Sequence, residues 1–328
     1  MKNVLVGLLA SVLTQAALAD LTLYTDRPTS RLLPAAQKFE ALTGEKVVIV
    51  EAAYPQLAER LKAEGETTPA DLLMTKDLVN LVDATERHLF QPFTMTEALL
   101  KVSPSMRDPQ NLWTAITFRV RSLVYDPSRV NPSEISSYAD LANAKWAGRL
   151  CLRTSRGGYN EALASYLIAQ NGAEGAKTIL SGWIDNLATN VFPNDISMLE
   201  AIAAGTCDVG ISNHYYLAQV VAQNPNFPIR MHFLEQNAGG VHTNGTGIGI
   251  LKTSDQKNLA QKFIELLLTD EFQLQISAGH FDYPAVQGLT PSSLIKDWGT
   301  FKADTRTWSE IGTHLPAARQ IFSEIGYK

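Results

Sequence analysis

Two adjacent tyrosines are the side chains in this sequence whose placement most clearly suggests chemistry. Tyr215 and Tyr216 follow the apolar run 209–211, which predicts a strand, and they precede residues 217–223, which predict a helix. Successive side chains of a strand point to opposite faces, but at a strand-to-helix turn both rings can reach a groove. The alternative is that both rings pack beneath a loop.

A third tyrosine stands at the same distance from a cysteine as the first of this pair. Cys151 precedes Tyr159 by eight residues, and Cys207 precedes Tyr215 by eight residues. In an oxidising compartment the two cysteines are expected to form a disulfide. If they are bonded on neighbouring strands, Tyr159 and Tyr215 emerge close together at one edge. Residues 154–158, with backbone and hydroxyl donors before a helix, are typical of an anion site.

Three phenols that meet in a groove suit a small cation of high charge. Fe(III) favours hard oxygen ligands. Coordination to a trivalent ion favours loss of the proton from a phenol, whose pKa in water is about 10. Three phenolates then balance three positive charges. Because binding releases protons, affinity for the metal should fall as the pH falls.

The beginning of the chain predicts export. Lys2 is followed by a mostly apolar run at 4–12 and by Ala17-Leu18-Ala19, whose small residues suit a signal-peptidase site. We therefore expect a cleaved signal peptide at residues 1–19, because the apolar run is too short to span a bilayer. The net charge of −5 and the lack of a basic stripe argue against binding to nucleic acid.

The rest of the sequence alternates between strand and helix patterns, which is typical of α/β proteins with mostly parallel sheets. A first unit alternates over residues 21–86, and a second unit begins near residue 149. The second unit is expected to contain strands at 149–153, 189–192 and 208–212 and helices at 161–170, 175–184 and 196–204.

Two segments are expected to join these units. The alternating run 115–125 predicts a strand that passes from one lobe to the other, and 246–251 predicts a strand that returns. We expect a two-lobed periplasmic binding protein fold (type II), in which each lobe has a mixed, mostly parallel sheet with flanking helices, and the ligand lies between the lobes. The predicted N-lobe comprises residues 20–119 and 245–295, and the predicted C-lobe comprises residues 120–244 and 296–328.

Over essentially the whole mature chain, the sequence resembles the bacterial periplasmic ferric iron-binding proteins that serve iron ABC importers. The paired tyrosines are the most specific part of this resemblance. It also rests on Leu23-Tyr24 with Arg27, Leu61-Lys62-Ala63-Glu64-Gly65, Thr68-Pro69-Ala70-Asp71, Trp146-Ala147-Gly148-Arg149, Tyr159-Asn160 and Asn213.

The resemblance implies roles for particular residues. Tyr159, Tyr215 and Tyr216 match the tyrosines that ligate Fe(III) in the family. Arg119 matches an arginine near the synergistic anion. Asn213 and Ser155 match positions that hold this anion or orient the tyrosines.

The chain departs from the family pattern in the first lobe. Pro28 and Thr29 stand where many members have a histidine or tyrosine ligand, and Lys76 stands where some have a glutamate. We therefore hypothesise that carbonate or bicarbonate completes the coordination of iron, held by Arg27 and Arg119, since a guanidinium suits a planar oxyanion. An ordinary ion pair is the alternative for each arginine.

Three further side chains are candidates for a role near the site. Tyr54 opens a helix in the first lobe and is a possible extra ligand, although packing is the more ordinary role there. His214 adjoins the tyrosine pair and is expected to lie outside the ligand set. Asp195 is expected to cap the helix that starts at Ile196.

The resemblance implies a monomeric periplasmic solute-binding protein, and not an enzyme, that delivers Fe(III) to an inner-membrane ABC transporter permease and ATPase. One alternative is a protein of the same fold that binds another small anionic or cationic solute. A secreted hydrolase is a weaker alternative, because the sequence contains neither a nucleophile elbow nor an HExxH motif.

Overall fold

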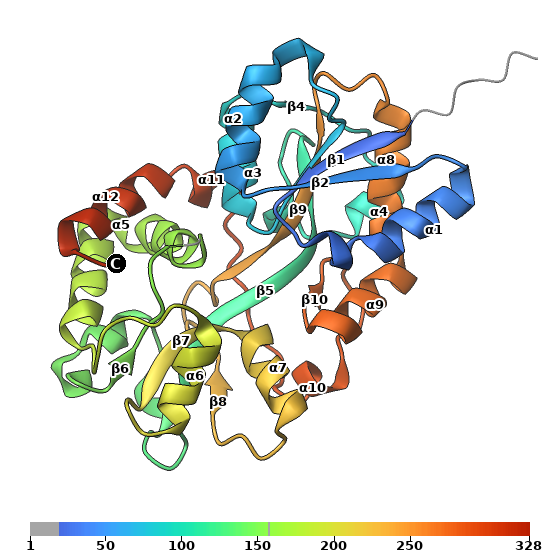
Figure 1. Ribbon diagram of the computed structural model, residues 1–328. Coiled ribbons are helices and arrows are strands. Elements are labelled where there is room, and N and C mark those ends of the chain that lie inside the picture. Colours follow the sequence, from blue (N-terminus) through green and yellow to red (C-terminus); the bar gives the residue numbers. More distant parts are fainter. Residues whose placement is uncertain (1–19, 157) are drawn as a thin grey trace, which may run out of the picture.

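The computed structural model describes residues 20–156 and 158–328, so the predicted signal peptide at residues 1–19 lies outside the described residues. The chain forms two halves, each with strands flanked by helices, and one long strand runs from one half into the other (Figure 1). The two-lobed α/β architecture expected from the sequence is confirmed. No helix among the described residues is long and apolar enough to cross a membrane.

The first half is built on a buried mixed sheet. Its strand order is β2-β1-β3-β9, in which β1 is parallel to β2 and β3 whereas β9 is antiparallel to β3. These strands are β1 (Leu21–Thr25), β2 (Val47–Glu51), β3 (Leu72–Thr75) and β9 (Thr243–Leu251). The helices of this half are α1 (Leu33–Thr43), α2 (Tyr54–Glu64), α3 (Leu78–Glu86), α4 (Glu97–Leu100), α8 (Lys257–Leu267) and α9 (Asp270–His280).

The second half contains a smaller set of strands, in which β6 and β7 are parallel neighbours. These strands are β6 (Leu150–Cys151), β7 (Val209–Asn213) and β8 (Arg230–His232). The later helices are α5 (Tyr159–Asp185), α6 (Asp195–Ala203), α7 (His214–Gln223), α10 (Ser293–Lys296), α11 (Trp308–Gly312) and α12 (Leu315–Ile325). Short 3-10 helices are η1 (Thr29–Arg31), η2 (Gly65–Thr67), η3 (Pro104–Met106), η4 (Pro132–Glu134), η5 (Ala139–Ala142) and η6 (Ala144–Trp146).

The strand β5 (Trp113–Tyr125) connects the two halves. Its residues up to Val120 pair with β9, and its residues from Arg121 onward pair with β7, both antiparallel. Strand β9 pairs with β3 as well, so it returns the chain to the first sheet as predicted. Two short strands, β4 (Phe90–Gln91) and β10 (Tyr283–Pro284), pair with β9 and β5 respectively.

The alternating glycines of β9 allow close packing instead of forming a nucleotide-binding loop. A Cβ atom on Gly245 would lie 2.2 Å from the carbonyl oxygen of Thr117 on β5, and one on Gly247 would lie 2.6 Å from a methyl carbon of Leu81 on α3. Glycine at these positions therefore lets β5 and α3 approach β9 closely.

Some predicted elements of the second half differ from the structure. The strand expected at 149–153 is only two residues long, and the strand expected at 189–192 is reduced to one bridge between Arg153 and Phe192. The two helices expected between 161 and 184 are confirmed, because α5 is divided at Gly172, whose φ of 71° and ψ of 169° are not helical. The polar residues around Gly172 predicted a break between two helices. Glycine readily adopts the non-helical conformation found there.

The predicted disulfide is present. Cys151 at the end of β6 is bonded to Cys207 just before β7, with their Cα atoms 5.9 Å apart. Both cysteines are buried within a cluster that includes Met198, Leu199 and Ile202 of α6. The covalent bond therefore ties the two parallel strands together beneath one helix.

Candidate functional site

The three tyrosines lie at the first turns of two neighbouring helices. Tyr159 is the first residue of α5, and Tyr215 and Tyr216 lie in the first turn of α7. Strands β6 and β7, which precede these helices, run parallel with Cys151 opposite Gly210. Because both segments leave the sheet in the same direction, the helices that follow them start beside each other.

The three phenols lie close enough together that each affects the pKa of the others. The rings of Tyr215 and Tyr216 have centroids 4.4 Å apart. The amide nitrogen of Asn213 donates to the Tyr215 hydroxyl at 3.1 Å. The structure thus brings Asn213 and all three tyrosines together.

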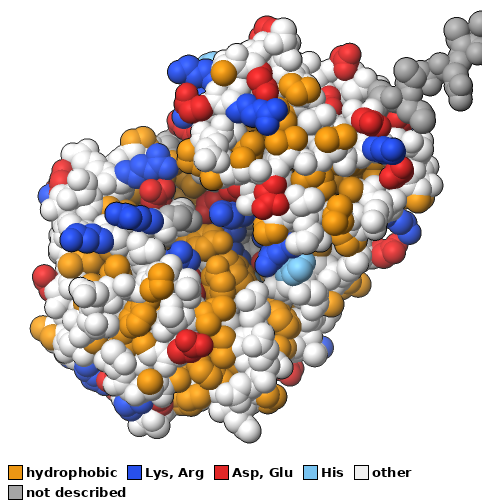
Figure 2. Space-filling view, viewed as in Figure 1, with side chains coloured by type: hydrophobic (Ala, Val, Ile, Leu, Met, Phe, Trp, Pro, Cys, Tyr) orange, Lys and Arg blue, Asp and Glu red, His pale blue; other side chains and the backbone are white. Residues whose placement is uncertain are grey.

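Positive charge surrounds the Tyr159 ring. The guanidinium carbons of Arg119 and Arg153 lie 4.9 Å and 5.1 Å from its centroid. Figure 2 shows a hollow between the two halves of the molecule, with Lys and Arg side chains gathered around it. Cations in this position favour an anionic phenolate and would also attract an anion.

The pKa values of the phenols differ because their neighbours differ. Burial would raise the pKa of Tyr159, but the charges of Arg119 and Lys76 and the hydrogen bonds from Tyr215 and Tyr216 lower it below its usual value. Burial and the neighbouring phenols raise the pKa of Tyr215 well above the usual value. Burial and Tyr159 raise the pKa of Tyr216 to about 12. Tyr159 is therefore the phenol prepared to lose its proton first.

Arg119 lies at the boundary between the two halves and is almost fully buried. Its guanidinium donates to the Lys76 carbonyl at 2.6 Å and to the Asp77 carboxylate at 2.9 Å, while its carbon atom lies over the ring of Tyr159. Asp77 also accepts a hydrogen bond from Asn244 at 2.7 Å. Arg119 thus joins the start of α3 in the first half to Tyr159 in the second.

The other two predicted anion-binding residues already have protein partners. Arg27 forms an ion pair with Asp282 at 3.1 Å. The hydroxyl of Ser155 donates to the Tyr327 carbonyl at 3.0 Å. The roles of Arg27 and Ser155 toward an anion stay predictions. To bind an anion, each side chain would have to leave its present partner or bond to both groups at once.

A buried ionic network supports the tyrosines and was not anticipated from the sequence. Asp195 is fully buried and pairs with Arg121 at 2.8 Å and with Arg153 at 2.7 Å. Arg121 also donates to Asn213 at 3.3 Å and to Asn160 at 3.1 Å. One carboxylate therefore organises two arginines, one beside Tyr159 and one beside the partner of Tyr215.

The prediction that Asp195 caps α6 is wrong. Asn194 is the cap, and its side chain accepts from the backbone N–H of Ser197 at 2.9 Å. Asp195 occupies the first helical position, where its carboxylate turns inward to the two arginines. Both Asn and Asp are common capping residues. Here Asp195 is drawn into ion pairs with Arg121 and Arg153, which are distant in sequence, so Asn194 caps the helix.

Tyr54 and His214 bond to groups outside the tyrosine cluster. The hydroxyl of Tyr54 donates to Asp83, which packs α2 against α3 in the first half. His214 uses both ring nitrogens, since Nδ1 accepts from the Val120 N–H at 3.2 Å and Nε2 lies 2.7 Å from the Phe281 carbonyl oxygen. The side chains of His214 and Tyr54 thus already have protein partners, and Tyr54 as an extra ligand stays a prediction.

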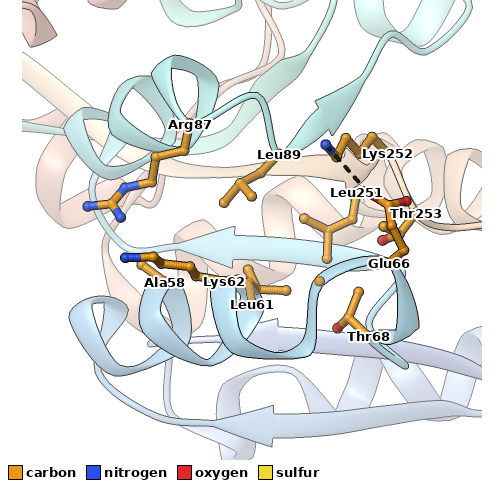
Figure 3. A pocket seen from close by; sticks show the side chains of 11 residues that line it. Ala58, Leu61, Lys62, Glu66, Thr68, Arg87, Leu89, Leu251, Lys252 and Thr253 are labelled. Carbon is orange, nitrogen blue, oxygen red and sulfur yellow. Dashed lines mark ion pairs between the residues drawn. The ribbon is translucent and has the colours of Figure 1, made fainter.

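A groove of about 400 Å³ lies in the first half, away from the tyrosines (Figure 3). Leu61, Leu89 and Leu251 form part of its wall. Of the cations at its rim, Arg87 pairs with Asp83 and Lys252 with Glu66. We place the candidate site at the convergent tyrosines, because they bring together several groups of one chemical type beside buried arginines. Among the described residues no group of three His, Cys, Asp or Glu could hold a metal ion.

Comparison with known proteins gives consistent results. The family model of bacterial extracellular solute-binding proteins matches residues 67–297. Iron uptake protein A1 of Synechocystis is 32% identical over 319 residues, covering 94% of this chain and 88% of the relative. An Fe(3+)-binding periplasmic protein of Serratia marcescens is 28% identical over 316 residues, covering 91% of each chain.

A solved structure extends this similarity to three dimensions. The Trichodesmium protein named IdiA or FutA, in complex with iron and citrate, has a TM-score of 0.87 and 34% sequence identity, covering 94% of this chain and 100% of that chain. The relatives are named for iron uptake or binding and not for catalysis. This supports the expectation of a binding protein over the hydrolase alternative.

Proposed function

This chain belongs to the bacterial extracellular solute-binding proteins, and from that membership we propose that it captures Fe(III) in the periplasm and delivers it to an ABC importer. The relatives named for ferric iron support the choice of solute. The protein is a transport component and not an enzyme. Its expected partners are an inner-membrane permease and its ATPase, which the monomeric loaded protein would contact.

The observation that carries this proposal is the convergence of three tyrosine hydroxyls beside buried arginines. Tyr159, Tyr215 and Tyr216 would ligate the ion as phenolates. Hard oxygen ligands suit Fe(III), and the three negative charges balance its charge. The lowered pKa of Tyr159 makes this residue the natural first ligand, after which the bound ion would promote deprotonation of the other two.

We further propose that carbonate or bicarbonate completes the coordination sphere, with Arg119 as its main donor. Arg119 lies over the ring of Tyr159 and is close to the tyrosine cluster. Asn213 orients Tyr215 in this scheme. Arg27 reaches the anion only if its ion pair with Asp282 opens, and Ser155 only if its hydroxyl turns from the Tyr327 carbonyl.

We propose that the predicted division into two lobes allows the protein to close over Fe(III) when it binds. Residues 20–119 and 245–295 form one lobe, and residues 120–244 and 296–328 form the other. The change of partner along β5 between Val120 and Arg121 supports a boundary there. Closure of the lobes over iron would change the surface that the importer contacts, so that loading and delivery are coupled.

The decisive experiment is a titration of the purified protein with ferric citrate, with and without bicarbonate. We expect a visible phenolate-to-Fe(III) absorption band in the native protein. Tyr215→Phe and Tyr216→Phe should each weaken the band and lower affinity by more than about 100-fold, which exceeds the usual loss of an outer hydrogen-bond partner.

Tyr125→Phe is the matched control. Tyr125 ends β5, and its hydroxyl makes no hydrogen bond among the described residues. This variant should bind iron like the native protein. Full affinity and full colour in both Tyr215→Phe and Tyr216→Phe would disprove the proposed ligand set, and binding without any visible band would point to a different solute site.

A further inference from the structure

The last two residues of the chain contact the loop that leads into Tyr159. Tyr327 follows α12 and is buried, with its ring against Phe322 at a centroid distance of 4.9 Å. Its hydroxyl donates to the Arg153 carbonyl at 2.7 Å and accepts from the Asn160 side-chain amide at 2.7 Å. A single phenol group thus joins residues on both sides of Tyr159.

Backbone groups at the carboxyl end reinforce this contact. The N–H of Ser155 donates to the Lys328 carbonyl at 2.9 Å, and the Ser155 hydroxyl donates to the Tyr327 carbonyl at 3.0 Å. Among the described residues of the segment 153–160, four hydrogen bonds lead to residues 327–328. These contacts span more than 160 positions of sequence, so they are tertiary and not local.

The loop depends on this external support because the sheet ends before it. Strand β6 stops at Cys151, and the final backbone bond toward the neighbouring segment is made by the Thr154 N–H to Phe192 at 2.7 Å. Gly158 adopts a positive φ of 88° immediately before Tyr159. The described contacts of the Ser155 backbone N–H lead to the C-terminus.

The same segment carries groups that act on the Tyr159 ring. Arg153 stacks over the ring, and its carbonyl is the group that accepts from Tyr327. Asn160 follows Tyr159 directly, bonds to Arg121, and donates to Tyr327. A shift of the C-terminal residues would therefore be transmitted to both neighbours of the proposed first ligand.

We propose that Tyr327 is a positioning residue for the Tyr159 phenol, so that the C-terminal dipeptide sets the geometry of iron binding without touching the ion. This inference rests on the proposed function, since it assigns Tyr159 a ligand role. It concerns the orientation of the ligand and not merely the stability of the fold.

The test compares Tyr327→Phe with Tyr125→Phe and Tyr215→Phe in the full-length mature protein. Each variant loses one phenolic hydroxyl. The readouts are affinity for Fe(III) in competition with citrate, the position and intensity of the visible band, and the thermal midpoint of the iron-free protein. We expect Tyr327→Phe to lower affinity by about 10- to 100-fold, the range for groups that orient a ligand, and to shift the band.

The outcomes separate the two proposals. If Tyr215→Phe loses iron and colour while Tyr327→Phe keeps the native affinity and band, the positioning role is wrong and the proposed function stands. A lower thermal midpoint with an unchanged band and affinity also overturns the positioning role. If Tyr215→Phe binds normally with full colour, the proposed function itself is wrong.

Deletion of Lys328 provides a second variant if Tyr327→Phe does not fold. It removes the carbonyl that accepts from the Ser155 N–H and leaves the Tyr327 hydroxyl in place. We expect the same direction of change in affinity and band. Native values for both readouts in this variant would count against control of Tyr159 by the C-terminus.

Discussion

At the scale of single residues, the site depends on unequal phenols. Burial acts to raise the pKa of Tyr159, but Arg119, Lys76 and the two neighbouring phenols together lower it, whereas the pKa values of Tyr215 and Tyr216 are raised. An apo site in which one phenol ionises before the other two avoids placing three negative charges side by side. The incoming cation then supplies the charge that permits the remaining two ionisations.

Arg119 is accordingly predicted to set the pH at which iron loads. In Arg119→Gln combined with Asp77→Asn, which avoids an unpaired buried carboxylate, the pKa of Tyr159 should rise. Fewer phenolates then form at a given pH, so the half-loading point should move to higher pH and affinity near neutrality should fall roughly 10-fold. The measurement is visible absorbance during a pH titration with Fe(III) and bicarbonate.

Asp77→Asn alone is the control for this pair. It keeps the Arg119 charge, so its loading curve should stay at the native pH or move lower. An unchanged loading curve and unchanged dependence on bicarbonate in the double variant would remove Arg119 from the site.

At the scale of elements, two parallel strands and one disulfide align the starts of α5 and α7. The bond between Cys151 and Cys207 fixes β6 against β7 before either strand reaches its tyrosine. Each cysteine precedes its tyrosine by eight residues, and this equal spacing reflects two parallel strands that end at the same edge of the sheet. It made the proximity of Tyr159 and Tyr215 predictable.

Removal of this disulfide should affect folding stability more than iron binding. The cysteines are 56 positions apart, and a closed loop of this size contributes on the order of 4 kcal/mol in the chain-entropy model. Cys151→Ala with Cys207→Ala should therefore show a clearly lower free energy of unfolding in urea, with little change in the visible band. A large spectral change with native stability would contradict this division of roles.

The elements that sequence predicted well have strong local patterns. The alternation in β5 and the glycines of β9 identified the two connecting strands, and the apolar run before Tyr215 identified β7. The strand predicted at 189–192 is not formed as a strand. Only Phe192 pairs there, through a single bridge to Arg153, and so short a pairing leaves no clear pattern in the sequence. The Asp195 network could not be predicted, since it depends on Arg121 and Arg153 from other elements. The pairing of Arg27 with Asp282 spans 255 positions and has no local signal.

At the scale of the whole molecule, His214 connects the two halves next to β5. Its Nδ1 accepts from Val120, and its Nε2–H can donate to the Phe281 carbonyl that follows α9. Burial lowers the pKa of His214 to about 4. The neutral ring is therefore part of the native connection between the halves, and protonation would remove the acceptor for Val120.

This connection predicts acid sensitivity of the iron-free protein. The pKa of His214 lies below its ordinary value of 6.5, so its contribution is complete above about pH 6.5 and is lost as the pH falls toward 4. The full loss is at most about 3 kcal/mol. In His214→Gln, the free energy of unfolding should depend less steeply on pH in this window.

His242 is also buried, and burial lowers its pKa, so it too makes the free energy of unfolding fall at acid pH. The slope of His214→Gln must therefore be compared with that of the native protein, because neither slope is expected to be zero. Chemical denaturation at a series of pH values gives the slopes. Equal slopes for the native protein and His214→Gln would show that His214 does not titrate with unfolding.

The contact of residues 327–328 with the loop before Tyr159 has a consequence for how the polypeptide becomes functional. These two residues bond to Arg153 and Ser155, which lie far earlier in the sequence. The loop therefore lacks this support until residues 327–328 have been synthesised and have packed against it. A chain that is cut before residue 327 should fold and yet compete poorly for scarce metal.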